Sequence, residues 1–156
     1  ELKQHRRWSY VVQCVILLTC AGCLQDVSND PAFRFERFAG RCFVARQDMF
    51  IDAVEDMEPL HIEYPGFIDI PNSIADYYKS PKSKYPDIVG IFRAGQRFRV
   101  NRLIRDRLSG MTQLHVIGVF LDGKFKDKPV ELTNLAVGQH GEWAFDEAYL
   151  APCRNE

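Results

Sequence analysis

Hydrophobic and polar residues alternate along much of the chain with the period of a β-strand, and turn residues interrupt the pattern every few positions. Two such segments, 42–45 and 49–54, flank Arg46-Gln47-Asp48 and predict a pair of strands. Further strands are expected at Ile88 to Phe92, Gln96 to Ile104, Thr112 to Leu121, Val130 to Leu135 and Glu142 to Phe145. The pattern therefore predicts a mainly β fold, either a small barrel or a sandwich.

Local signals add turns and one helix to this outline. Asp122-Gly123 predicts a tight hairpin, and Ala94-Gly95 and Ser109-Gly110 predict further turns. An acidic, proline-containing insert separates the early strands from the later ones. Within the insert, Ser73 with Asp76 three residues later is a capping-box pattern, which predicts a helix of one or two turns from Ile74 to Tyr78.

The beginning of the chain has the pattern of an export signal. Lys3, Arg6 and Arg7 precede an almost wholly apolar stretch, residues 10–24. A helix that crosses a bilayer needs about 20 apolar residues, so this stretch is short for a permanent span and suits a signal peptide. An uncleaved N-terminal anchor and a buried helix are the alternatives.

The segment Leu18-Thr19-Cys20-Ala21-Gly22-Cys23 resembles the lipobox of bacterial lipoproteins, with Cys20 where that family usually has Leu. The resemblance implies cleavage before Cys23, lipid such as palmitate on Cys23, and attachment to a membrane of the cell envelope. Leu24 and Gln25 follow Cys23, and the lack of Asp there implies the outer membrane, with the domain facing the periplasm. The expected organisation is a signal peptide at 1–22, the lipidated cysteine and a tether that docks onto the domain at 23–39, and one domain at 40–156.

Cysteine parity predicts a disulfide. Of the five cysteines, Cys14 and Cys20 leave with the signal peptide and Cys23 takes the lipid, so that Cys42 and Cys153 remain. An even pair in an exported protein is typical of a disulfide, although two separate buried thiols are the alternative. No Cys-x-x-Cys motif or histidine cluster accompanies either residue, so we expect no metal and no cofactor.

The segment from residue 90 to residue 135 resembles the SH3-like β-barrels of exported bacterial proteins. Its Ala94-Gly95 turn precedes Arg97-Phe98-Arg99-Val100, and a long hairpin ends in Val130-Glu131-Leu132. Together with the lipobox, an early Gly-Arg-Cys-Phe and a late Cys, the arrangement is similar to small envelope lipoproteins of unassigned function. The resemblance implies an SH3-like barrel and carries over no catalytic residue.

Charge is distributed unevenly along the chain. Residues 47–78 hold eight acids and no Lys or Arg, whereas residues 79–128 hold twelve basic residues and four acids. Alternation with Phe98 and Val100 places Arg97 and Arg99 on the side away from the core, and with Arg102 they form a candidate anion-binding row. The acidic insert could instead fold back over these arginines, or the row could be merely solvated. An open row would suit an anionic envelope component, such as lipopolysaccharide phosphate or peptidoglycan carboxylate, or an acidic partner protein.

No motif in the sequence predicts an enzyme. The net charge of −1 argues against nucleic acid as the main partner. No nucleophile elbow, phosphate loop or dinucleotide fingerprint is present. His61 and Glu63 could lie on one face of a strand and, joined by His115 or His140, hold a metal. No two histidines sit at helical ligand spacing, so the histidines are expected to be surface or loop residues. We therefore expect a lipid-anchored binding or structural module of the cell envelope; the alternative is an envelope hydrolase with an unrecognised site.

Overall fold

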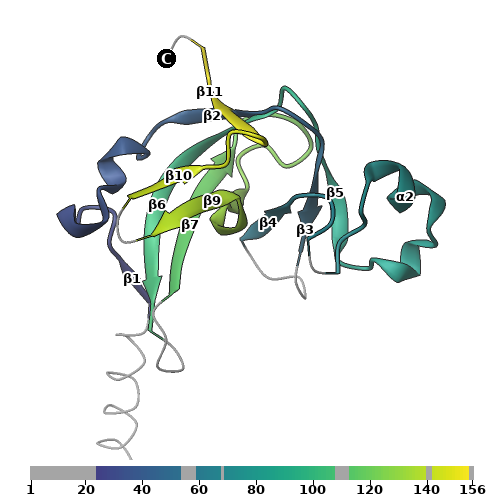
Figure 1. Ribbon diagram of the computed structural model, residues 1–156, viewed down its shortest axis with the longest axis horizontal. Coiled ribbons are helices and arrows are strands. Elements are labelled where there is room, and N and C mark those ends of the chain that lie inside the picture. Colours follow the sequence, from purple (N-terminus) through teal and green to yellow (C-terminus); the bar gives the residue numbers. More distant parts are fainter. Residues whose placement is uncertain (1–23, 54–58, 68, 108–112, 140–141, 155–156) are drawn as a thin grey trace, which may run out of the picture.

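The computed structural model describes residues 24–53, 59–67, 69–107, 113–139 and 142–154, and it is mainly β (Figure 1). The strands are β1 (Leu24–Asp26), β2 (Cys42–Ala45), β3 (Met49–Asp52), β4 (Leu60–Glu63), β5 (Ile88–Phe92), β6 (Arg97–Asp106), β7 (Gln113–Phe120), β8 (Pro129–Glu131), β9 (Ala136–Gln139), β10 (Glu142–Phe145) and β11 (Leu150–Pro152). The helix α2 spans Ile74–Lys79, and 3-10 turns lie at Pro31–Phe33, Phe35–Arg37, Lys82–Lys84 and Thr133–Leu135. The predicted mainly β class with a short helix is confirmed.

The strands form one mixed sheet that curls into a half-barrel. Its order is β11-β2-β6-β7-β8-β4-β3-β5, and β1 pairs with the far half of β6. The β8–β4 pair is parallel and joins the long β6–β7 wall to the β3–β4–β5 wall, which stands at an angle to it in Figure 1. The hairpin β9–β10 forms a separate two-stranded sheet.

The core fills the inside of the curl and is rich in phenylalanine. Phe98 on β6 and Phe120 on β7 are fully buried, and Phe92 on β5 lies with its ring centroid 6.1 Å from that of Phe98 and 5.4 Å from that of Phe120. Phe145 of β10 packs edge-on against Phe43 of β2, with centroids 4.7 Å apart. These aromatic contacts hold the two walls and the small hairpin to a single core.

The predicted pairing of the first two strands is wrong. β2 pairs with β6 and β11, whereas β3 pairs with β4 and β5. The three residues between β2 and β3 therefore carry the chain from one wall to the other. Hydrogen bonds hold this connection at both ends: Arg46 N donates to Tyr149 O at 2.8 Å, and the Asp48 carboxylate accepts from Ala94 N and Arg93. The Ala94-Gly95 turn connects β5 to β6 in the same way, from wall to wall.

The predicted tight hairpin at Asp122-Gly123 is also wrong. β7 and β8 are antiparallel neighbours as expected, but residues 121–128 connect them. Gly123 and Asp127 both have positive φ angles, of 78° and 67°, which suits a longer reversal. The other predicted turn, Ser109-Gly110, lies outside the described residues.

The predicted start of the helix is confirmed. Helix α2 begins where the capping box predicts, since Asp76 N donates to Ser73 Oγ at 3.0 Å and the Ser73 hydroxyl donates to the Asp76 carboxylate. On β7, Val116 and Phe120 belong to the core, and Ile117 is buried on the opposite face of the strand.

Residues 24–39, expected as a tether that docks onto the domain, contribute to the same core. Strand β1 is part of the sheet, and Val27 and Phe35 are members of the hydrophobic cluster around Phe98. The alternation of Phe33 and Phe35 with charged residues therefore reflects packing onto the domain. The signal peptide and Cys23 lie outside the described residues.

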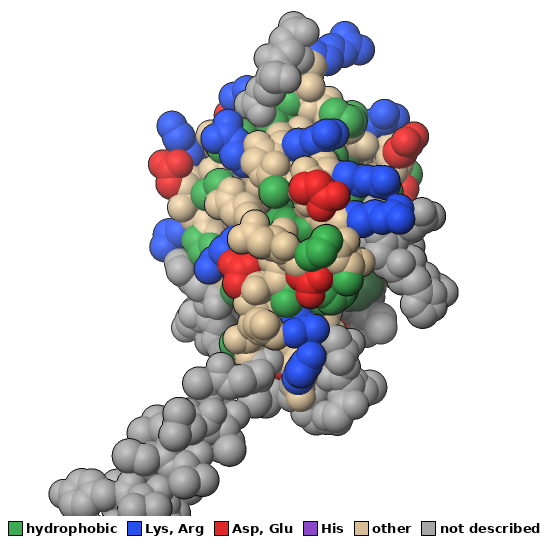
Figure 2. Space-filling model, turned by 90° about the vertical axis from the view of Figure 1, so that its left-hand side faces the viewer, with side chains coloured by type: hydrophobic (Ala, Val, Ile, Leu, Met, Phe, Trp, Pro, Cys, Tyr) green, Lys and Arg blue, Asp and Glu red, His purple; other side chains and the backbone are tan. Residues whose placement is uncertain are grey.

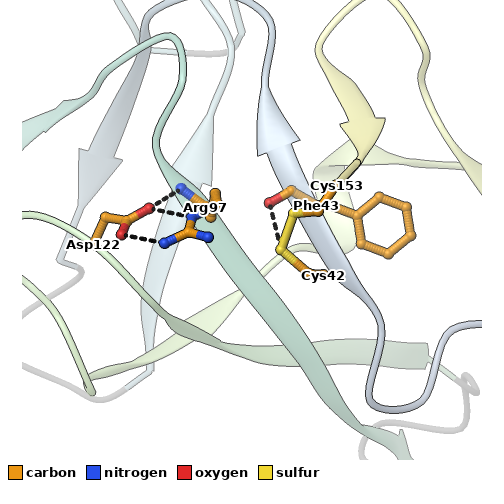
Figure 3. The surroundings of a disulfide bond; sticks show 5 residues. All are labelled: Cys42, Phe43, Arg97, Asp122 and Cys153. Atoms are coloured by element: carbon orange, nitrogen blue, oxygen red, sulfur yellow. Dashed lines mark hydrogen bonds and ion pairs between the residues drawn. A yellow bond between two sulfur atoms is a disulfide. The ribbon is translucent and has the colours of Figure 1, made fainter. Parts of the chain in front are cut away.

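The disulfide between Cys42 and Cys153 is present (Figure 3). β11 pairs antiparallel with β2, and the two cysteines continue that register one residue beyond β11, with Cys153 N donating to Cys42 O at 3.0 Å. Their Cα atoms are 5.4 Å apart, within the usual range for a disulfide. The bond closes a sequence separation of 111 residues and fastens the last strand to the sheet.

We expect loss of this bond to lower the stability of the fold. Closing a loop of about 100 residues stabilises the native state by up to about 5 kcal/mol on the chain-entropy account. The double variant Cys42→Ser/Cys153→Ser should therefore show a lower free energy of unfolding in denaturant titrations. Dithiothreitol should destabilise the native protein and leave the double variant unchanged. Two alkylatable thiols at these positions in the unreduced protein would contradict the disulfide.

Candidate functional site

The three arginines of the predicted row do not form one continuous surface. Arg97 and Arg99 are exposed while Phe98 and Val100 are buried, so the predicted alternation is confirmed. The β6–β7 register then shifts between Val100 and Arg102, as in a β-bulge. After the shift, Arg102 faces outward together with residues 104 and 106, in the second half of β6 and five residues from Arg97.

Arg97 pairs with Asp122, which lies in the same basic segment of the chain, residues 79–128. Its Nε and Nη2 donate to Asp122 Oδ2 and Oδ1 at 2.9 and 3.1 Å, and its backbone N donates to Oδ2 at 2.9 Å (Figure 3). These hydrogen bonds lower the pKa of Asp122. The Asp122 side chain thereby closes the loop after β7 onto the start of β6.

The acidic segment, residues 47–78, contacts the basic segment at Arg93 and not at the three predicted arginines. Asp48 accepts a hydrogen bond from Arg93 Nη1 at 2.5 Å, and Arg93 Nη2 donates to the hydroxyl of Tyr78 at 3.1 Å. Helix α2 covers the outer side of β3, where the rings of Tyr77 and the fully buried Phe50 lie 5.6 Å apart. The insert thus packs beside β3 and β5. That Arg97, Arg99 and Arg102 bind an anion stays a prediction.

A groove of about 670 Å³ lies on the outer face of the sheet, on the side opposite the core. Its residues come from five segments and are Leu24, Asp26, Pro59, Arg102, Ile104, Asp106, His115, Ile117, Pro129 and Glu131. Cross-strand register brings Ile117 opposite Arg102 and His115 opposite Ile104. The volume is typical of small-molecule sites, and the groove combines an apolar floor with a few charged groups.

At one side of the groove, His115 and Glu131 form a close pair. The His115 Nδ1 atom lies 2.7 Å from Glu131 Oε1, which also accepts a hydrogen bond from the Thr133 hydroxyl at 2.8 Å. His61 Nε2 lies 4.0 Å from Glu131 Oε2. The remaining ring nitrogen of His115, Nε2, is shielded from solvent and has no hydrogen-bond partner in the described structure. This arrangement orients the imidazole ring.

Glu63, beside this pair, is a buried carboxyl group. Its Oε1 accepts a hydrogen bond from Asn134 Nδ2 at 2.7 Å, whereas Oε2 is buried without a partner in the described structure. Burial raises the pKa of Glu63 to about 7, and the charges of Asp52 and Glu131 act in the same direction. Protonation removes the negative charge, and this lowers the cost of burying the carboxyl group in the interior.

The histidines and acids near Glu131 do not form a metal centre. Within the described part of the chain, no group of three or more His, Cys, Asp or Glu side chains is arranged to hold a metal ion. His140 lies outside the described residues.

The groove has no local sequence signal, because its residues come from β1, β6, β7, β8 and the residue before β4. Alternation from Phe98 and Val100 would place Arg102 on the core side, and only the bulge in β6 turns it outward into the groove. The surface shown in Figure 2 carries Lys and Arg side chains over its upper part and again at its lower end, mixed with Asp and Glu.

No family model, curated protein or solved structure matches the chain. Among the described residues, no helix is long and apolar enough to cross a membrane. The resemblance to envelope lipoproteins and to SH3-like barrels accordingly remains a prediction.

The raised pKa of Glu63 generates a test of the buried carboxyl. Because the folded state holds this proton more tightly than the unfolded state, Glu63 leaves the fold most stable below about pH 4.5. It destabilises the fold progressively as the pH rises to about 7. Glu63→Gln should therefore be more stable than the native protein at pH 8, by up to about 3 kcal/mol, and similar to it at pH 4.5. Unfolding titrations at the two pH values measure this difference.

The exposed residue Glu147 provides a matched control, since Glu147→Gln makes the same chemical change at the surface. We expect this variant to follow the native protein at both pH values. Equal stability of Glu63→Gln and the native protein at pH 8 would show that Glu63 ionises in the fold as it does in water.

Proposed function

We propose that this chain is a lipid-anchored binding module of the bacterial cell envelope, attached through Cys23 and facing the periplasm from the outer membrane. The single observation that carries the proposal is the position of the groove, whose wall includes Leu24, the residue that follows Cys23. The disulfide supports an exported location, because such bonds persist in oxidising compartments.

The SH3-like identity of the domain belongs to this proposal. Its support is a strongly curled sheet of mostly short strands around one core, with the β6–β7 hairpin as its longest element. The arched connections around Arg46–Asp48 and Ala94-Gly95 carry the chain between the two walls, and both lie at the same end of the core.

The ligand we propose for the groove has an apolar body and an anionic group. Ile104 and Ile117 supply an apolar floor, and Arg102 is the member of the arginine row that lines the groove. Two of the acids there already have partners: Asp26 accepts hydrogen bonds from the amide and hydroxyl of Ser28, and Glu131 is held by His115 and Thr133. Arg102, whose charge also helps to lower the pKa of Asp26 after the Ser28 hydrogen bonds, is the arginine of the groove that an incoming anion would meet.

Lipidation of Cys23 is tested in a bacterial host with two membranes. The native chain should incorporate a palmitate analogue and fractionate with the outer membrane. The variant Cys23→Ser should lose the label and accumulate as an unprocessed precursor, whereas Cys20→Ser should still be labelled. Normal labelling and maturation of Cys23→Ser would overturn the proposed anchor.

The groove is tested with 8-anilinonaphthalene-1-sulfonate, a probe with an apolar ring system and one anionic group. We expect saturable fluorescence enhancement with the folded protein. Affinity should fall about tenfold in Ile117→Lys or Arg102→Glu, because the first change fills the floor with charge and the second reverses the charge beside it. Val89→Lys, which alters an exposed apolar residue on β5 outside the groove, is the control. Equal binding by all four proteins would rule out the groove as the site.

A further inference from the structure

Strand β1 begins immediately after the proposed lipidated cysteine. Leu24 pairs with Asp106, Gln25 with Arg105 and Asp26 with Ile104, and Val27 N then donates to Leu103 O at 2.9 Å. One residue of extended chain spans at most about 3.6 Å. A lipid on Cys23 would therefore be attached one residue away from the sheet, without a flexible spacer.

The same end of the sheet carries groups suited to a membrane surface. The side chain of Leu24 is 62% exposed. Arg107 lies just beyond β6, and Arg105 lies one residue before its end, where its guanidinium contacts the Gln25 side chain. Arg102 lies near the middle of the strand, on the same outward face as Asp106. Arginine side chains at such a position can place their aliphatic part at the interface and their charge among lipid phosphates.

The opposite end of β6 is distant from this surface. Arg97 and Asp106 are separated by nine residues of strand, which is roughly 30 Å. The disulfide joins the sheet near the Arg97 end, because Cys42 pairs with Arg99. In Figure 1 the C-terminus accordingly lies at the top, and β1 with the end of β6 lies at the bottom.

We infer that the domain sits directly on the bilayer in one orientation, with the Leu24 and Asp106 end of the sheet against the headgroups and Arg102 and Arg107 facing anionic phospholipid. The inference rests on the proposed lipidation of Cys23. It adds an orientation and a contact surface to the anchor, and it places the mouth of the groove at the level of the headgroups. A ligand would then reach the groove from the membrane surface.

Two glutamines provide matched reporter positions. Gln113 pairs with Asp106 at the membrane end, whereas Gln47 lies in the connection after β2 at the distal end, and both are exposed. Lipidated Gln113→Trp and Gln47→Trp, each combined with Trp143→Phe so that the mature chain holds one tryptophan, are reconstituted in vesicles of phosphatidylethanolamine and phosphatidylglycerol with brominated acyl chains. We expect the bromines to quench the new tryptophan at 113 at least twofold and to leave the one at 47 unaffected.

Two further variants distinguish two causes of the orientation: the short link between the lipid and the sheet, and the attraction of the arginines to anionic headgroups. Ten Gly/Ser residues inserted between Cys23 and Leu24 should reduce the difference between the two reporters. Combining that insertion with Arg102→Gln and Arg107→Gln should abolish it. Equal quenching at 113 and 47 in protein that carries the lipid would overturn the inference and leave the anchor intact. Protein that mass spectrometry shows to lack the lipid would overturn the proposed function, and the inference with it.

Discussion

The hydrogen-bonded pairing along β6 is the interaction on which the rest of the structure depends. This ten-residue strand pairs with β7 over nearly its whole length, while β2 and β1 share its other edge at opposite ends. Its inward residues, Phe98, Val100 and Leu103, are fully buried and lie in one core with residues of β3, β4 and β5. The N-terminal segment pairs with one end of β6, the disulfide-bonded strand β2 pairs with the other end, and the groove lies on its outer face. The positions of all three are therefore fixed by this strand.

The bulge in β6 gives its two ends different surfaces. Before it, Arg97 is engaged by Asp122; after it, Arg102 lies in a groove with Ile104. The backbones of β6 and β7 are closely packed beside the bulge. A Cβ atom on Gly118 of β7 would lie 2.7 Å from the carbonyl oxygen of Arg99. Only glycine allows β7 to follow β6 so closely at this point. The local irregularity thus creates the site, whereas the regular part of the strand forms the core.

The features that the sequence predicted correctly depend on residues close together in the chain or on the number of cysteines. Alternation located β6, the capping box located the start of α2, and cysteine parity identified the Cys42–Cys153 bond. Prediction failed where pairing joins distant segments: β2 and β3 are close in sequence but belong to different walls. The groove could not be predicted for the same reason, since its residues become neighbours only through register. The burial of Glu63 follows from its pairing with Phe50 on β3, which the local pattern does not reveal.

The position of β1 determines how the domain would bear a mechanical load. A pull on the chain at residue 23 would be borne first by the three residue pairs between β1 and β6, and next by Val27 and Phe35 in the core. The Cys42–Cys153 bond would carry none of this load, because it lies near the far end of β6 and outside the path from residue 23 to the core. Detachment of β1 would therefore precede unfolding of the half-barrel sheet. The residues between β1 and β2, about 15 in number, could then extend. They would act as a flexible linker to the anchor while the disulfide-bonded part of the domain stays folded.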